Sequence, residues 1–436
     1  MRLDDYLEDV RPDEAAERRR LAEEKSYEIL EYVEGVADRF KTATRDGTVV
    51  GSTSPSIFVG RSNYPSVSTG ILAPVGEEER AAEFETSGDW YDRGLGIEHV
   101  LQYRTGLLNS NRTANVDVAG RRPASRGTSS LAVHDVWDGF LGVQREVAIA
   151  DDPVDVELGL SEDVDLDLTL DEVTTPRGPR ARAERAQLTE NPSVPRAVEK
   201  TLADDDWTAQ GAMCYLYRRG FDVYDVNTIL SAGALGRAEN RRLVPTRWSI
   251  TAVDDAIGEY LRGTIRNRSS VDEVQVWMNE YVGNRYWVVL APGAWEFELV
   301  EMKSPGSVWN PDPAGDVWMA SAHEEYVGRS DYVDETAGAY YAARLGVLEH
   351  LHERGRQAKA LVLREVSDEY WAPVGVWQIR ESVRNAFDGE YGTAESFGDA
   401  VAAIGTELPV SSAALRRKST MVAGLQTALD DFGPGG

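Results

Sequence analysis

The sharpest catalytic pattern in the sequence is an acidic residue two positions before a lysine. Glu301 and Lys303 close the strand-like run 295–303, and metal-dependent nucleases place such a pair at a strand end. In those enzymes two carboxylates hold Mg²⁺, while the lysine orients the attacking water. Asp254 and Asp255 are the candidates for the second carboxylate. Because the pattern is short and common by chance, a surface strand with alternating charges is the alternative interpretation.

A second polar cluster could supply a metal ligand or a general acid. It comprises His323, Glu324 and Glu325, with Arg329 and Asp331 close behind. Lone polar clusters more often have a structural role, and the five histidines form no His-x-x-x-His pair. The single cysteine of this chain excludes a cysteine-based zinc finger. We therefore predict no resident metal and no cofactor, apart from Mg²⁺ if the nuclease hypothesis holds.

Arginine clusters are the candidates for DNA binding, since arginines contact phosphate oxygens without reading sequence. One cluster lies in a segment whose Pro and Gly residues predict a loop, and it comprises Arg177, Arg180, Arg182 and Arg185. A second group is formed by Arg237, Arg241, Arg242 and Arg247. The alternative is that these arginines neutralise the protein's own carboxylates, and the sequence leaves both interpretations open.

A turn that could bind a phosphate or a base lies between two predicted strands, at residues 60–65. Gly60 leaves backbone N–H groups accessible, while Arg61 and Tyr64 suit phosphate contact and base stacking. The segment matches no phosphate-loop or dinucleotide fingerprint. A turn fixed by Pro65, with no binding role, is an equally good interpretation.

The C-terminal residues match the core of the peptide that binds replication sliding clamps of the PCNA type, Gln-x-x-aliphatic-x-x-aromatic. Gln426, Leu429 and Phe432 occupy the three positions. A 3₁₀ turn has three residues per turn, so these side chains would share one face and fill the clamp's hydrophobic pocket. Gly433 stands where a second aromatic residue is usual, which should weaken binding. The alternative is a helix end with an incidental phenylalanine.

The charge balance indicates the environment of the protein more than its activity. Asp and Glu number 74 against 46 Lys and Arg, giving a net charge of −28, and only six of the basic residues are lysines. Surplus carboxylate keeps a protein soluble in molar salt, which screens repulsion to within about 3 Å. We interpret the balance as adaptation to a salty cytoplasm, and it does not exclude DNA as a partner. An ordinary acidic protein would not explain the scarcity of lysine.

The sequence carries no signal for a membrane or for export. No apolar run approaches the roughly 20 residues that cross a bilayer, and the N-terminal residues lack the apolar segment of a secretory signal. We therefore expect a cytoplasmic protein with no membrane partner.

The elements that must position these residues follow from hydrophobic periodicity and from breaks in the chain. Helices are predicted at 1–41, 195–219, 335–355 and 376–387, and a strand leading into a helix at 243–268. Strands are predicted around 52–74, 130–173, 273–303 and 358–366. The class that follows is α+β, in which mixed sheets pack against helices.

The length of 436 residues favours two domains. The clearest break is the Pro- and Gly-rich stretch 304–313. We therefore predict an N-terminal domain at 1–305, with a helical start and a β-rich middle, and a C-terminal α/β domain at 306–415. Hydrophobic periodicity is lost near residue 411, so 416–436 is predicted as a flexible tail that carries the clamp motif.

Several segments and the terminal motif carry a family resemblance that covers nearly the whole chain. The segments are Phe58–Arg61 with Tyr64-Pro65, Val244–Thr251, Ala339–Arg344, and Leu363–Glu365 with Pro373–Glu381. On these residues the chain resembles the archaeal Nre family (NreA and NreB), whose members are implicated in DNA repair. The resemblance implies two family domains meeting near residue 305 and clamp binding through the tail. Many members carry a four-cysteine N-terminal element, which this chain lacks, so zinc is not expected here.

Together these patterns predict a DNA repair factor that is recruited to DNA by the sliding clamp and is weakly enzymatic or not enzymatic at all. Its expected partners are the clamp, DNA contacted directly or through the clamp, and other repair proteins. One alternative is a clamp-tethered, Mg²⁺-dependent nuclease acting on damaged DNA. Another is an unrelated metabolic enzyme with a coincidental tail, which would carry an enclosed small-molecule pocket.

Overall fold

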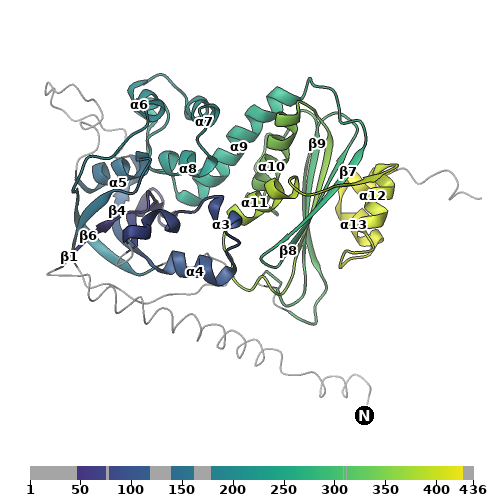
Figure 1. Ribbon diagram of the computed structural model, residues 1–436, viewed down its shortest axis with the longest axis horizontal. Helices are drawn as coiled ribbons and strands as arrows, with labels where there is room; N and C mark the ends of the chain where they lie inside the picture. Colours follow the sequence, from purple (N-terminus) through teal and green to yellow (C-terminus); the bar gives the residue numbers. More distant parts are fainter. Residues whose placement is uncertain are drawn as a thin grey trace, which may run out of the picture.

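The computed structural model describes residues 47–74, 78–117, 139–161, 178–307, 309–310 and 312–425. Within them the chain forms two six-stranded mixed sheets, with helices between the sheets and on the outer side of the second sheet (Figure 1). This arrangement confirms the α+β class expected from the sequence. The predicted helix at 1–41 and the clamp motif at 426–433 lie outside the described residues.

The first sheet has the strand order β1-β5-β6-β4-β3-β2. Only the β4–β6 pair is parallel. Alternate residues of each strand point into one apolar core, where Ile71, Leu108 and Leu158 are fully buried. The strands are β1 (Thr48–Ser52), β2 (Ile57–Val59), β3 (Ser66–Pro74), β4 (Leu107–Asn115), β5 (Asp155–Leu160) and β6 (Arg180–Leu188).

Two predictions for this region were wrong. The stretch 130–173 was expected to be β-rich, but its described part contains the helix α5 (Gly139–Ile149) as well as β5. Phe140, Val147 and Ala148 of α5 recur at helical spacing and bury against the sheet. The arginine-rich segment expected to be a loop is strand β6, which lies between β5 and β4.

Short helices link the first sheet to the second. The predicted helix at 195–219 is two helices, and the long helix α9 begins directly after the irregular residues 241–245, without the strand expected there. The elements are η1 (Glu78–Phe84), α3 (Asp89–Asp92), α4 (Ile97–Thr105), α6 (Arg196–Ala203), α7 (Ala209–Arg218), α8 (Val223–Ser231), η3 (Ala238–Asn240) and α9 (Thr246–Ile265).

The second sheet has the order β10-β9-β11-β8-β7-β12, in which only β9 and β11 run parallel. Its strands confirm those predicted at 273–303 and 358–366. They are β7 (Val274–Tyr281), β8 (Asn284–Ala291), β9 (Glu296–Lys303), β10 (Trp318–Glu324), β11 (Lys359–Val366) and β12 (Gly392–Ala394).

Helices cover both faces of the second sheet (Figure 1). Along β8, Val288 and Leu290 pack toward α9, α10 and α11, whereas Val289 and Ala291 pack toward α12 to α14. Because this strand is buried on both faces, its sequence is a nearly continuous run of apolar residues. The helices are α10 (Ala337–Arg354), α11 (Trp377–Ala386), α12 (Phe397–Ile404), α13 (Ser412–Lys418) and α14 (Thr420–Ala423).

The boundaries predicted from the sequence do not coincide with those of the sheets. Residue 305 lies between β9 and β10, which are paired neighbours in the second sheet. The beginning of the predicted tail is also folded, because α14 ends at Ala423 and Glu298 of β9 accepts hydrogen bonds from its first turn. Among the described helices, none is long and apolar enough to cross a bilayer.

Candidate nucleic-acid interface

The loop between β2 and β3 is held in one conformation by its own backbone. Gly60 N donates to the carbonyl of Ser68 at 2.7 Å, and Ser66 N donates to that of Asn63 at 2.8 Å. Asn63 adopts a positive φ of 62°, a conformation that asparagine tolerates better than most residues. These bonds turn the side chain of Tyr64 outward, where it is 43% exposed.

Helix α9 fixes the position of this loop. The hydroxyl of Thr246, the first residue of α9, accepts a hydrogen bond from Val59 N at 3.0 Å. A second link runs through Val116, whose N donates to Pro65 O and whose O accepts from Leu243 N. As a result Tyr64 meets Trp248 of α9, with ring centroids 5.2 Å apart and ring planes inclined by 52°.

Three exposed arginines accompany the two rings. Arg61 belongs to the loop, Arg247 precedes Trp248, and Arg242 lies in the segment that leads to α9. None of the three forms an ion pair with a residue that the structure describes. We call Arg61, Tyr64, Arg242, Arg247 and Trp248 the aromatic surface. It unites two segments of the family resemblance that are about 180 residues apart in the sequence.

Sequence reasoning found part of this surface. It proposed Arg61 and Tyr64 as a binding loop and placed Arg242 and Arg247 in a separate arginine group, and the structure brings this loop against the first turn of α9. It missed Trp248. The available signal was a tryptophan next to an arginine, but the residues before Asp254 were expected to form a strand, whereas the helix begins at Thr246 and leaves Trp248 exposed in its first turn.

The arginines of β6 form a second basic surface. Arg180 and Arg182 alternate with the buried Ala181 and Ala183, so both point to the outer face of the sheet. A β-bulge follows, where the pairing with β5 shifts register, and it keeps Arg185 exposed as well. We call Arg180, Arg182 and Arg185 the arginine face, and a depression of about 240 Å³ lies beside it.

The arginine face and the aromatic surface lie toward the same end of the first sheet. Because β6 runs parallel to β4, Arg182 lies beside Asn111 and Arg185 lies further toward the C-terminal end of β4. Strand β3 begins at that end, where Ser66 pairs with Asn115, and the 60–65 loop precedes it. Both predicted DNA-binding groups are therefore close to one edge of the molecule.

The other arginine candidates differ in environment. Arg177 lies outside the described residues. Arg241 is buried and donates to the backbone carbonyls of Leu202 and Gly236 at 3.0 and 2.9 Å, and burial lowers its pKa. Its role is therefore structural, although its hydrogen bonds go to backbone carbonyls and the carboxylate of Asp205 lies 3.9 Å away. Arg237 is exposed at the start of η3.

Among the nuclease candidates, Glu301 is only 3% exposed and forms an ion pair with the buried Arg364 of β11. Lys303 lies 3.9 Å from Glu301 and 4.2 Å from the ring centroid of Trp318. Burial lowers the pKa of Lys303. This environment holds both side chains in place within the sheet.

The upstream aspartates are also bound to arginines. Asp254 is 1% exposed, and both of its oxygens lie 2.7 Å from one nitrogen of Arg380. Asp255 accepts from the buried Arg344. The described residues contain no group of three or more His, Cys, Asp or Glu side chains placed to hold a metal ion. With each carboxylate bound to its own arginine, the geometry does not favour the nuclease hypothesis.

The polar cluster at 323–331 likewise makes internal contacts. His323 Nε2 lies 2.9 Å from Glu296 Oε1, and Glu324 is buried between Trp295 and Arg344, with both contacts at 2.8 Å. Arg329 donates to the carbonyl of His323 at 2.7 Å. The structure therefore supports the structural interpretation of this cluster.

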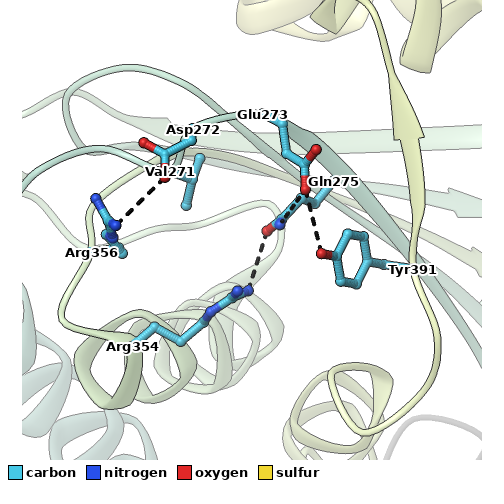
Figure 2. A pocket seen from close by; sticks show the side chains of 7 residues that line it. All are labelled: Val271, Asp272, Glu273, Gln275, Arg354, Arg356 and Tyr391. Carbon is cyan, nitrogen blue, oxygen red and sulfur yellow. Dashed lines mark hydrogen bonds and ion pairs between the residues drawn. The ribbon is translucent and has the colours of Figure 1, made fainter.

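A pocket of about 370 Å³ lies beside β7 and the end of α10 (Figure 2). Its polar side chains bind one another: Arg354 donates to Gln275 at 3.3 Å, and Tyr391 donates to Glu273 at 3.4 Å (Figure 2). Apart from Val271 and the ring of Tyr391, its lining consists of charged and amide side chains. It does not have the enclosed, largely apolar shape expected of a small-molecule site.

The fold and these surfaces define a two-sheet α+β protein with exposed arginine and aromatic groups near one edge. The archaeal Nre N-terminal model matches residues 21–310, and the archaeal Nre C-terminal model matches residues 324–432. The chain belongs to the archaeal Nre family. No solved structure matches it.

Its relatives agree with this assignment. The chain is 64% identical over 434 residues to the protein named DNA repair protein NreA of Haloferax volcanii, covering 99% of this chain and all of the relative. It is 36% identical over 358 residues to DNA repair protein NreA of Archaeoglobus fulgidus, covering 82% and 85% of the two chains. It is 32% identical over 385 residues to DNA repair protein NreB of the same organism, covering 88% and 92%.

Proposed function

We propose that the protein is a cytoplasmic DNA repair factor, recruited by the sliding clamp through its C-terminal motif and contacting DNA directly with the first sheet. The names of its relatives support the repair role. The observation that carries the DNA contact is the grouping of exposed arginines with exposed aromatic rings near one edge of a chain whose net charge is −28. Such groups suit phosphate and base contacts.

The position of the motif supports its role in recruitment. The described chain ends at Leu425, which packs against the cluster beneath α12 to α14, and Gln426 is the next residue. The motif thus follows the folded part of the chain directly. Short peptides that order on binding are a common way to attach one protein to another.

Calorimetric titration of the cognate sliding clamp in molar salt tests the recruitment. We expect the intact protein to bind and the Gln426→Ala/Phe432→Ala double variant to lose binding, because both the polar and the apolar contacts are gone. Thr427→Ala, at a position between the contact residues, serves as the matched control and should bind like the wild type. Equal binding by the wild type and the double variant would contradict the proposal.

The same preparations separate the proposal from the nuclease alternative. A nuclease would cleave damaged DNA only with Mg²⁺ and would lose that activity in Lys303→Ala. We expect no cleavage by the wild type, because Glu301 and Asp254 are each bound to a buried arginine. Mg²⁺-dependent cleavage that Lys303→Ala abolishes, while the variant remains folded, would establish the alternative instead.

A further inference from the structure

We propose that Tyr64 and Trp248 bind an unpaired nucleobase, while Arg61 and Arg247 contact the adjoining phosphates; this inference rests on the proposed function and names its ligand. The site would take single-stranded DNA, or a base displaced from a duplex, in preference to paired DNA. The reason is geometric, because the faces of paired bases are covered by their neighbours in the stack.

The two rings lack the polar partners that other exposed aromatic residues have. Trp318 contacts Lys303, and Tyr391 donates to Glu273. Among the residues that the structure describes, Tyr64 and Trp248 contact each other, and neither Tyr64 Oη nor Trp248 Nε1 has a hydrogen-bond partner. Their faces and polar atoms therefore remain available to a ligand.

The rings are also held in place before any ligand arrives. Thr246 fixes Val59 at the start of the loop, and Val116 fixes Pro65 at its end. Trp248 belongs to the first turn of a 20-residue helix. A preorganised pair of rings loses little conformational freedom when a base stacks on it, which favours binding.

The arginines identify the ligand as an anionic polymer with aromatic bases. Arg61 lies three residues before Tyr64 in the same loop, and Arg247 precedes Trp248 in the first turn of α9, so each ring shares its element with an exposed arginine. Neither arginine forms an ion pair with a described carboxylate, although the chain has 74 acidic residues. Single-strand binding sites combine stacking platforms with such phosphate contacts.

Fluorescence anisotropy of labelled DNA with the full-length protein tests the inference. The probes are a single strand of about 12 nucleotides, the matched duplex, and that duplex with one unpaired thymine. We expect the single strand to bind more tightly than the duplex. Trp248→Ala and Tyr64→Ala should each weaken its binding about tenfold, whereas Trp248→Phe, which keeps a ring, should retain most of it.

Salt dependence separates the two kinds of contact. Arg61→Ala and Arg247→Ala should each reduce the slope of log K against log salt by about 0.7, the value for one phosphate on a single strand. Trp248→Ala should lower affinity and leave the slope unchanged. The matched control is Trp318→Ala, a tryptophan of nearly equal exposure (44% against 45%) on the second sheet, which should bind like the wild type.

The unpaired thymine distinguishes the two sources of a free base. Tight binding of that duplex supports recognition of a displaced base, and tight binding of the single strand alone supports single-stranded DNA. Unchanged binding in Trp248→Ala and Tyr64→Ala, or equal affinity for paired DNA, overturns the inference while leaving direct DNA contact intact. The wild-type protein could also bind the clamp and none of the DNA probes. That result would overturn both this inference and the direct DNA contact of the proposed function.

Discussion

At the scale of single residues, buried arginines account for most of the acidic groups that looked catalytic in the sequence. Arg364 and Arg380 both form buried ion pairs. Their partners are Glu301 and Asp254 rather than the adjacent Glu365 and Glu381. Sequence reasoning could not supply these partners, because the parallel pairing of β9 with β11 and the contact of α9 with α11 join residues far apart in the chain.

Asp254→Ala should lower the free energy of unfolding by about 3–5 kcal/mol, because it leaves the buried guanidinium of Arg380 without its counter-charge. Denaturant titration measures the change. The matched control is Glu335→Ala, which removes the partly exposed ion pair with Lys418 and should cost less than about 1 kcal/mol. Similar costs for the two variants would contradict a structural role for Asp254.

The contact between His323 and Glu296 should make stability depend on pH. The hydrogen bond from His323 lowers the pKa of Glu296 from 4.5 to about 2, against the effect of burial and with help from Lys359. The same bond raises the pKa of His323 above 6.5. The carboxylate's contribution is complete above pH 4.5 and is lost toward pH 2. The contribution of the His323 imidazole to stability is complete below pH 6.5. It is lost as the pH rises through the raised pKa of His323.

We therefore expect the pair to contribute most between pH 4.5 and 6.5 and to contribute less at higher pH. Thermal unfolding of the wild type and of His323→Gln from pH 5 to 9 measures the effect as a difference between the two curves. His99→Gln, at an exposed histidine, is the control and should leave the dependence unchanged. A constant difference between the curves of wild type and His323→Gln from pH 5 to 9 would refute the linkage.

At the scale of elements, periodicity predicted the helices and strands that bury a regular face. The segments 335–355, 358–366 and 376–387 match α10, β11 and α11. The errors arose where tertiary contacts override local signals. Pro and Gly near β6 suggested a loop, but pairing on both sides makes it a strand, and one bulge decides which way Arg185 points. The position of a bulge cannot be located from hydrophobic periodicity. The arginine face could therefore not be derived from the sequence.

The short helix α14 should depend on a single buried carboxylate. Glu298 is fully buried and accepts hydrogen bonds from Ser419 Oγ, Thr420 N and Met421 N, at 2.7, 2.7 and 2.8 Å. Glu298→Gln replaces one acceptor oxygen with a donor and should cost about 1–3 kcal/mol. It should also speed amide hydrogen exchange at residues 419–423.

Ser411→Ala is the matched control, since it removes the N-cap of α13 but not a contact to Glu298. It should cost about 1 kcal/mol and leave exchange in α14 slow. Slow exchange in Glu298→Gln would show that apolar packing alone holds α14 on the sheet.

At the scale of the whole molecule, the surplus of 28 negative charges should make folding depend on salt. Repulsion among carboxylates acts over a Debye length of about 10 Å at 0.1 M salt and about 3 Å at 1 M. We expect the melting temperature to rise steadily from dilute buffer to molar KCl. Sucrose at matched osmolality provides the control for effects other than screening, and an unchanged melting temperature in KCl would contradict the salt-adaptation hypothesis.

The overall class was predictable from the sequence, whereas the division of the chain was not. The sequence break near residue 305 agrees with the gap between the two family models, at 310 and 324. In space, however, β9 and β10 on either side of it are paired, and an apolar cluster joins Trp90 and Leu101 to Trp377. A loop between two strands of one sheet and a linker between domains have the same composition, so the sequence could not separate them.

The folded end of the chain has a mechanical consequence for recruitment. Leu425 is packed on the second sheet, and the clamp motif starts at the next residue. No linker residues therefore separate the motif from the described fold. A long flexible linker lets a bound protein sweep a wide volume, whereas a junction of one residue confines it to a narrow range of orientations. In the proposed complex the folded protein would therefore approach the encircled DNA in a restricted range of orientations.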